Sequence, residues 1–330
     1  MQTVGLAAIG LGAGGCSTRP MAADRSAPAW NGPMPAISGI ARVDASRYLV
    51  VHDVKSASAR AAGEAEQEDT PPWRCGLMTF VEGGTPRYEP LHVLEHGPIQ
   101  GNDIEAVTPV PGRAGSFYLL ESGSDRKHRR LFTVTVRTDG AAATATLDER
   151  VIDLQPYTKS LANVEGIVAD RLEDGRVMLL LADRGDQRGN EPAVDPAVEF
   201  VGIMLDADGR VEATPGSTLR LTGSYGRGWR LCTDLCPDPD GNVWMSSSLD
   251  SGNMGPFESR VFRIGKLQDG RFVAGEPEQT NVIAGHKVEG ICFTELRVAA
   301  GRGTTKPVNV LMLASDNEGF GGAVGVAGTR

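Results

Sequence analysis

Hydrophobic and polar positions along this chain follow a pattern that repeats. Each copy opens with a tetrad of a hydrophobic residue, an acid, a small residue and a second hydrophobic residue, and continues with an apolar segment that ends in an acid. The three complete copies are Ile104-Glu105-Ala106-Val107 with 118–121, Val164-Glu165-Gly166-Ile167 with 179–183, and Val288-Glu289-Gly290-Ile291 with 311–316. Two degenerate copies are Ser38-Gly39-Ile40 with 50–53, and Thr233-Asp234-Leu235 with 244–250. Such self-similarity predicts a repeat architecture.

The spacing of the copies indicates the size of each repeat. Taking positions 39, 105, 165, 234 and 289 as markers, the copies begin 66, 60, 69 and 55 residues apart. Further apolar segments and Asp-Gly turns between the markers give four strands per interval, which suits a propeller blade. We therefore predict one all-β domain over residues 30–330, a β-propeller of five four-stranded blades around a central channel, with six blades as the alternative. Because few residues follow Asp316, residues near Trp30 to Ala36 are expected to complete the last blade.

The N-terminus carries a separate signal. An apolar run from Val4 to Leu11 is followed by small residues up to Cys16, which resembles a bacterial lipoprotein signal, although no Lys or Arg precedes the run. This predicts a signal segment at 1–16, a lipidated Cys16, a flexible tether at 17–29 and a location in the bacterial cell envelope. The run is too short to span a membrane, so contact would be through the lipid anchor only. A Gly/Ala-rich leader without lipidation is the alternative.

The net charge narrows the possible partners, and the cysteines leave disulfide pairing open. The net charge of −9 and a pI of about 5.2 argue against a nucleic-acid partner, because such binding requires a basic face. A small-molecule or protein ligand at the channel is expected instead, on a monomeric protein. Cys75, Cys232, Cys236 and Cys292 permit disulfides, but their spacing favours no pairing.

Strand polarity predicts where the repeated acids lie. The first two strands of a blade are antiparallel, so the start of one and the end of the next share a rim of the sheet. The inner acids and predicted metal ligands are Glu105, Glu165, Asp234 and Glu289. The surrounding rim is predicted to contain Asp53, Glu121, Asp183, Arg184, Asp250, His286 and Asp316. Like charges so placed cost about 2 to 3 kcal/mol for a pair roughly 6 Å apart at an effective dielectric near 20.

Several arrangements could offset this repulsion. Carboxylates are ligands that Ca²⁺ selects. Alternatively, basic side chains such as Arg184, Arg126 or Lys287 could pair with the acids, or some acids could stay protonated. A further possibility is that the acids accept backbone N–H groups of the neighbouring blade and hold the ring together.

The motifs resemble those of the esterase-like phytase and SdiA-regulated group of β-propellers. Val164-Glu165-Gly166-Ile167 with Asp183-Arg184, and Val288-Glu289-Gly290-Ile291 with Asp316-Asn317, carry this resemblance. The segment from Thr233 to Trp244 is similar to strands of gluconolactonase-like propellers. The resemblance implies a calcium-supported hydrolase of phosphate esters or lactones, with channel carboxylates as ligands and a metal-activated water as nucleophile. The chain departs from it at Gly39, where an acid is expected, and in having no evident basic phosphate-binding cluster.

Two functions follow as hypotheses. The first is a calcium-dependent envelope hydrolase, and the second is a non-catalytic lipoprotein that presents one rim of its channel to a small-molecule or protein ligand.

Overall fold

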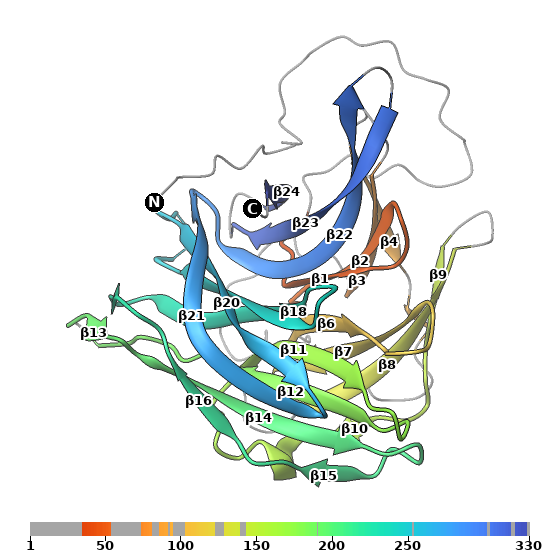
Figure 1. The fold of residues 1–330 in the computed structure, drawn as a ribbon, viewed down its shortest axis with the longest axis horizontal. Coiled ribbons are helices and arrows are strands. Elements are labelled where there is room, and N and C mark those ends of the chain that lie inside the picture. The colour runs from red at the N-terminus through yellow and green to blue at the C-terminus, as the bar shows by residue number, and fades with distance from the viewer. Residues whose placement is uncertain are drawn as a thin grey trace, which may run out of the picture.

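The computed structural model shows five β-sheets arranged in a ring, so the chain is a five-bladed β-propeller (Figure 1). The structure describes residues 35–53, 74–80, 86–91, 93–94, 103–122, 129–138, 143–189, 191–252, 254–301, 304–317 and 321–328. The innermost strands β1, β6, β11, β18 and β22 each contact the next around the ring, and β22 contacts β1. The prediction of five blades is confirmed.

The strands occur in chain order within each blade. Blade 1 contains β1 (Gly39–Arg42), β2 (Arg47–Val51), β3 (Cys75–Thr79) and β4 (Arg87–Leu91). Blade 2 contains β6 (Ile104–Pro109), β7 (Ser116–Glu121), β8 (Arg130–Arg137) and β9 (Thr144–Leu147), with β5 (Val93–Leu94) and β10 (Ile152–Asp153) added at its outer side. Blade 3 contains β11 (Val164–Arg171), β12 (Val177–Asp183), β14 (Ala197–Leu205), β15 (Val211–Ala213) and β16 (Ser217–Arg220). Blade 4 contains β18 (Trp229–Pro237), β19 (Asn242–Leu249), β20 (Glu258–Gln268) and β21 (Arg271–Ala284). Blade 5 contains β22 (Val288–Gly301), β23 (Thr304–Asp316) and β24 (Gly322–Gly328).

Two minor elements lie outside the blades. The strands β13 (Ala193–Val194) and β17 (Ser224–Tyr225) pair with each other, and a 3₁₀ turn at Gln155–Tyr157 precedes blade 3. Blade 5 has three strands in the described part of the chain. Most of the segment predicted to complete it, residues 30–34, lies outside the described residues. Residues 35–37 are not in a strand, but the Ile37 N–H donates to the Ser315 carbonyl of β23 at 3.3 Å, so this segment does run beside blade 5.

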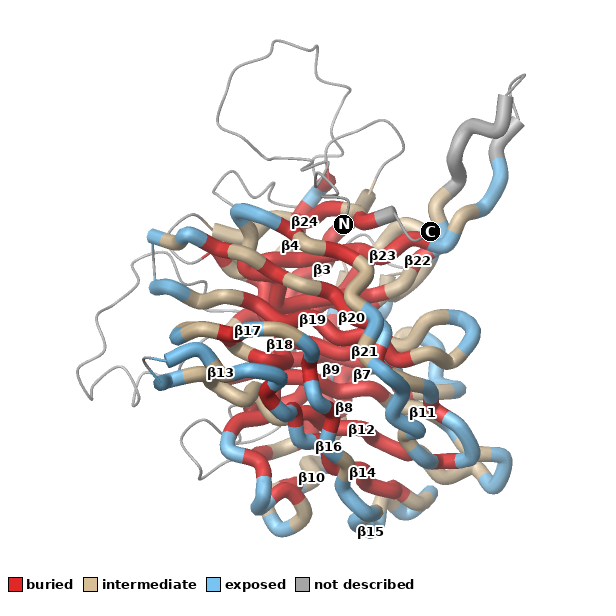
Figure 2. The backbone as a smooth tube through the Cα atoms, turned by 60° about the vertical axis from the view of Figure 1, so that its left-hand side comes forward, coloured by how far each residue is buried: buried red, intermediate tan, exposed pale blue. Residues whose placement is uncertain are grey.

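The hydrophobic core lies between neighbouring blades. Among the described residues, five clusters of buried apolar side chains occur, one at each blade junction; the largest joins blades 3 and 4 through residues such as Phe200, Trp229 and Phe262. Buried positions follow the middle of each sheet, and exposed positions gather in turns and outer strands (Figure 2). Fully burying a side chain of this size stabilises the fold by about 1.5 to 3 kcal/mol.

The tetrads open the innermost strands, and their acids sit at irregularities in the pairing. In β6, β11 and β22 the register shifts across Glu105, Glu165 and Glu289, so each glutamate has no partner residue in the ladder. The small residue after each glutamate packs against the next blade. A Cβ on Gly290, for example, would lie 3.0 Å from the Ile40 nitrogen of blade 1.

This register corrects the alignment of the two degenerate copies. Gly166 pairs with Ala182 and precedes Ile167, and Asp234 pairs with Ser246 and precedes Leu235 in the same manner. Asp234 therefore occupies the position of the small residue, and Thr233 occupies that of the glutamate. In blade 1, Gly39 likewise matches the small residue, and Ser38 takes the glutamate position. The markers at 39 and 234 were wrong by one residue, because sequence similarity alone does not show the register shift.

Other expectations have mixed outcomes. The four cysteines at positions 75, 232, 236 and 292 are all free and buried, so none forms a disulfide. The predicted signal segment, Cys16 and the tether lie outside the described residues. Among the residues that the structure does describe, no helix has the length and apolar character needed to cross a membrane.

Candidate metal centre

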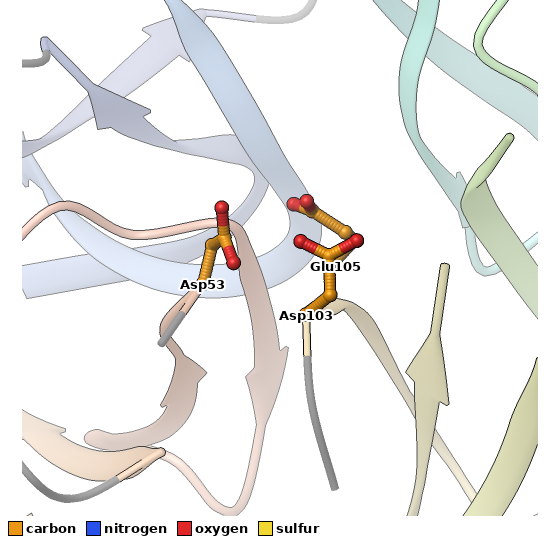
Figure 3. A group of neighbouring side chains, drawn as sticks. All are labelled: Asp53, Asp103 and Glu105. Carbon is orange, nitrogen blue, oxygen red and sulfur yellow. The ribbon is translucent and has the colours of Figure 1, made fainter. Parts of the chain in front are cut away.

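Three carboxylates converge at the junction of blades 1 and 2. Asp53 follows β2 of blade 1, whereas Asp103 precedes β6 and Glu105 lies in β6 of blade 2. One carboxylate oxygen from each lies within 4.8 Å of the others, and the side chains approach one another from the two blades (Figure 3). We call these three residues the acid cluster.

Local backbone geometry places each member of the acid cluster. The Asp53 N–H donates to Ser38 Oγ at 2.9 Å, which links the end of β2 to the residue before β1. Asp103 adopts a positive φ of 60°, a conformation tolerated best by Gly, Asn and Asp, and turns the chain into β6. The hydroxyl of Ser122, the residue after β7, donates to Asp103 Oδ2. The shift in register at Glu105 then directs its side chain away from the ladder.

Glu105 differs electrostatically from the other tetrad glutamates. It is 7% exposed, and within the described part of the chain its carboxylate has no hydrogen-bond donor and no ion-pair partner. Burial, followed by the charges of Asp53 and Asp103, raises its pKa well above the usual value. Three ionised carboxylates at this separation would repel one another by about 3 kcal/mol per pair at an effective dielectric near 20. A buried acid in this setting is stabilised either by a proton or by a cation.

The other two tetrad glutamates are bound by basic side chains. Glu165 Oε1 accepts hydrogen bonds from Arg184 Nη1 at 2.8 Å and from Asn163 Nδ2 at 3.1 Å. Glu289 Oε1 accepts Arg230 Nη1 at 2.5 Å and lies 3.3 Å from Lys287 Nζ. Burial nevertheless raises the pKa of Glu289 to about 8. These pairs confirm the expectation that basic residues neutralise part of the ring. The charges of Glu165 and Glu289 still act on Glu105 and help to raise its pKa.

The same basic residues also bind acids predicted at the rim. Arg230 donates to Asp250, and Lys287 Nζ lies 3.0 Å from Asp316 and 4.0 Å from Asp250. Arg184 also pairs with Asp186, at 2.6 Å from its Nε. Arg230 and Lys287 with their carboxylates thus form an ion-pair network across blades 4 and 5, and Arg184 with Glu165 and Asp186 forms a separate one on blade 3.

Asp234 lies outside both groups. Its Oδ1 accepts the Leu235 N–H at 2.8 Å and its Oδ2 accepts the Ile291 N–H of blade 5, also at 2.8 Å. It is fully buried, and burial raises its pKa well above the usual value. Asp234 therefore connects two blades, which is the alternative role considered for the repeated acids, and is not assembled with the other predicted ligands.

The remaining rim residues have local structural contacts. Glu121 is bound by Arg130 of β8 through Nε at 2.5 Å and Nη2 at 2.7 Å. Asp183 accepts the backbone N–H groups of Ala162 and Asn163 at 3.3 Å and 2.9 Å. His286 Nδ1 lies 3.1 Å from Asn317 Nδ2. These contacts place Glu121, Asp183 and His286 in the support of the rim rather than in the acid cluster.

Two residues of the site were missed by sequence reasoning. Asp103 could have been found, because a second acid two residues before a tetrad glutamate is visible in the sequence. Arg230 gave no such signal, since it precedes its tetrad by three residues and reaches Glu289 on another blade.

A cluster of three carboxylates suits a hard cation that binds several oxygen ligands. Ca²⁺ takes six to eight oxygens from carboxylates, carbonyls and water. Asp53, Asp103 and Glu105 together offer six carboxylate oxygens from two blades, and they fit such an ion by the chemistry of their donors.

Comparisons with known proteins add little beyond the fold. No protein-family model matches the sequence, and no curated protein matches it at a stringent threshold. Among solved structures, a protein of the GH130 family of mannoside phosphorylases, which contains glycoside hydrolases that target β-1,2-mannosidic linkages in Candida mannan, aligns over 89% of this chain and 84% of its own, with 11% identity and a TM-score of 0.47. An exo-1,5-α-L-arabinanase from a bovine ruminal metagenomic library aligns over 89% and 92%, with 14% identity and a TM-score of 0.41. The PQQ domain of pyranose dehydrogenase from Coprinopsis cinerea aligns over 91% and 97%, with 11% identity and a TM-score of 0.39. These similarities are weak, so the assignment as a propeller rests on the sheet topology of the chain itself.

Proposed function

We propose that the protein is a calcium-dependent hydrolase whose metal centre is the acid cluster of Asp53, Asp103 and Glu105. The observation that carries the proposal is Glu105, a buried carboxylate that accepts no hydrogen bond and forms no ion pair among the described residues and lies beside two further carboxylates. The resemblance to calcium-supported propeller hydrolases agrees with this assignment. The acid cluster replaces the four metal ligands expected from the sequence, Glu105, Glu165, Asp234 and Glu289, of which it retains only Glu105.

The residues around the channel would have different roles in the reaction. A calcium ion, when bound, supplies a Lewis acid and lowers the pKa of a coordinated water. Asp53, Asp103 and Glu105 would hold and orient it, and each would lose the repulsion of its neighbours. Arg184 and Asn163 bind Glu165, and Arg230 and Lys287 bind Glu289, so these two glutamates are already held by protein groups.

The charge of the mouth favours a neutral substrate over a phosphate ester. Within the described residues, Arg184, Arg230 and Lys287 at the mouth each already contact at least two carboxylates, and the exposed Arg188 pairs with Asp186. A phosphate dianion would have to displace one of these carboxylates, whereas a lactone or neutral ester would not. We therefore propose a lactone or neutral ester as the substrate. We further propose that the protein is a monomer held at the cell envelope by a lipid on Cys16.

The test compares thermal unfolding and turnover in one series of samples. Calcium at 100 times its dissociation constant should stabilise the wild type by about 2.7 kcal/mol relative to EDTA, and magnesium should stabilise it less. Glu105→Gln should abolish the calcium effect and hydrolysis of a chromogenic lactone. The exposed Glu199→Gln, which also removes one negative charge, serves as the matched control and should behave as wild type.

Two outcomes would contradict the proposal. If calcium leaves the unfolding midpoint of the wild type unchanged, the acid cluster is not a calcium site. If calcium stabilises the protein but neither a lactone, a neutral ester nor a phosphate ester is turned over, the protein binds a ligand without catalysis.

A further inference from the structure

A buried arginine next to the acid cluster forms no ion pair among the described residues. Arg129 precedes β8, is 5% exposed, and makes all of its described hydrogen bonds to uncharged oxygens. Its Nε donates to the Ser122 carbonyl at 3.0 Å, and its Nη1 donates to the carbonyl and hydroxyl of Thr158 at 2.7 and 2.8 Å. The guanidinium also reaches the carbonyls of Leu161 at 3.3 Å and Ala162 at 3.1 Å.

These bonds connect two segments that are distant in the sequence. The first is the end of β7, where Ser122 donates its hydroxyl to Asp103 of the acid cluster. The second is the loop 154–163, which leads from blade 2 into blade 3. At the end of that loop Asn163 donates to Glu165. Arg129 therefore contacts Ser122, which donates to Asp103, and Ala162, the residue before the Asn163 that donates to Glu165.

The chemistry of arginine suits this position. Its planar guanidinium presents five N–H donors in a fixed fork, so it can hold several carbonyls in one relative geometry. Lysine carries the same charge but presents three donors on a flexible stem. Groups that orient metal ligands without touching the metal commonly change affinity 10- to 100-fold when they are replaced.

We propose that Arg129 is a positioning residue of the metal centre, acting through Ser122 on Asp103. This inference rests on the proposed function, since it assumes that the acid cluster binds calcium. Arg129 itself touches neither the ion nor the substrate. Its effect would pass along the bonds from its Nε to the Ser122 carbonyl and from the Ser122 hydroxyl to Asp103.

The experiment measures calcium affinity on the full chain by competition with a chromophoric chelator, alongside unfolding midpoints in EDTA. Arg129→Lys and Ser122→Ala should each raise the calcium dissociation constant about 10-fold. The double variant should resemble the weaker-binding single variant, because both changes act on one path. Arg130→Lys alters the adjacent arginine, which pairs with Glu121, and should leave the dissociation constant unchanged.

The results separate the inference from the function on which it rests. Calcium binding absent from the wild type would overturn the proposed function. A wild type that binds calcium together with Arg129→Lys and Ser122→Ala variants of equal affinity would overturn the role of Arg129. Independent effects that multiply in the double variant would also overturn it. If Arg129→Lys fails to fold, Ser122→Ala still tests the path to Asp103, and an unchanged affinity in that variant excludes it.

Discussion

Asp234 Oδ2 accepts a 2.8 Å hydrogen bond from the backbone N–H of Ile291, and this bond joins β18 of blade 4 to β22 of blade 5. Because Oδ1 accepts the Leu235 N–H, one buried side chain satisfies two buried donors on two blades. Asp234, one of the four acids predicted from the sequence as metal ligands, thus has a structural role.

Replacing Asp234 with Ala should destabilise the fold without affecting calcium. Two buried N–H groups would lose their acceptor, at about 1 to 3 kcal/mol for each group left unsatisfied. Urea unfolding in EDTA and in calcium should show the same loss in both conditions. A variant of normal stability that no longer responds to calcium would instead identify Asp234 as a ligand.

Replacing Arg230 with Met should leave Glu289 with only Lys287 as a cationic neighbour. Breaking a buried ion pair on one side commonly costs about 3 to 5 kcal/mol. The double variant Arg230→Met with Glu289→Gln should recover part of this loss, because the uncompensated charge is gone. Urea unfolding of the wild type, both single variants and the double variant measures the coupling; strictly additive effects would show that the two side chains do not interact.

The buried His52 should make the free energy of unfolding depend on pH. Burial lowers its pKa from 6.5 to about 4, although the Ala36 carbonyl at 2.6 Å and the charge of Asp316 both act in the opposite direction, and Tyr88 Oη lies 2.8 Å from its Nε2. Because the folded pKa is below the unfolded one, its contribution is complete above pH 6.5 and is lost as the pH falls towards 4. The difference between the two values corresponds to about 3 kcal/mol.

The check is urea unfolding in EDTA between pH 7.5 and 4, for the wild type and His52→Gln. The stability of the wild type should fall more steeply than that of the variant below pH 6.5. Curves that run parallel would mean that His52 does not titrate on unfolding in this range.

Gly290 should tolerate no side chain, because blade 1 lies against it. A Cβ there would lie 3.0 Å from the Ile40 nitrogen and 3.1 Å from the Gly39 carbonyl carbon, both rigid backbone atoms. Gly290→Ala should therefore destabilise the ring by about 1 to 3 kcal/mol, as overpacking commonly does. Gly275→Ala is the control, since its Cβ would find no atom closer than 3.6 Å; equal midpoints for the two variants would contradict the close approach of the blades.

The sequence predicted the propeller and its five blades because the complete tetrads at 104–107, 164–167 and 288–291 recur at the spacing of a blade. Asp-Gly turns between strands were also predicted, and at Asp240-Gly241 the structure agrees: Asp238 accepts the N–H groups of Asp240 and Asn242 at the start of β19. Local patterns of this kind are visible in a single sequence because the contacts that cause them are local.

The composition of the site was less predictable. Strand polarity placed all the repeated acids at one rim, but it could not show which of them meet a cation from another blade. Glu289 is neutralised by Arg230 from the start of β18, and Glu105 has no such partner in the described part of the chain. The difference between two identical tetrad residues depends on contacts between blades, which no pattern within a blade records.

The hydrogen bond from Asp53 to Ser38 gives the closure of the ring a kinetic consequence. Ser38 follows Ile37, whose N–H bonds to blade 5, so the segment that closes the ring also anchors one member of the acid cluster. Detachment of this segment would remove the hydrogen bond that anchors Asp53 and so weaken the hold on an ion bound there. The lifetime of the bound ion would then depend on how often the ring opens between blades 5 and 1.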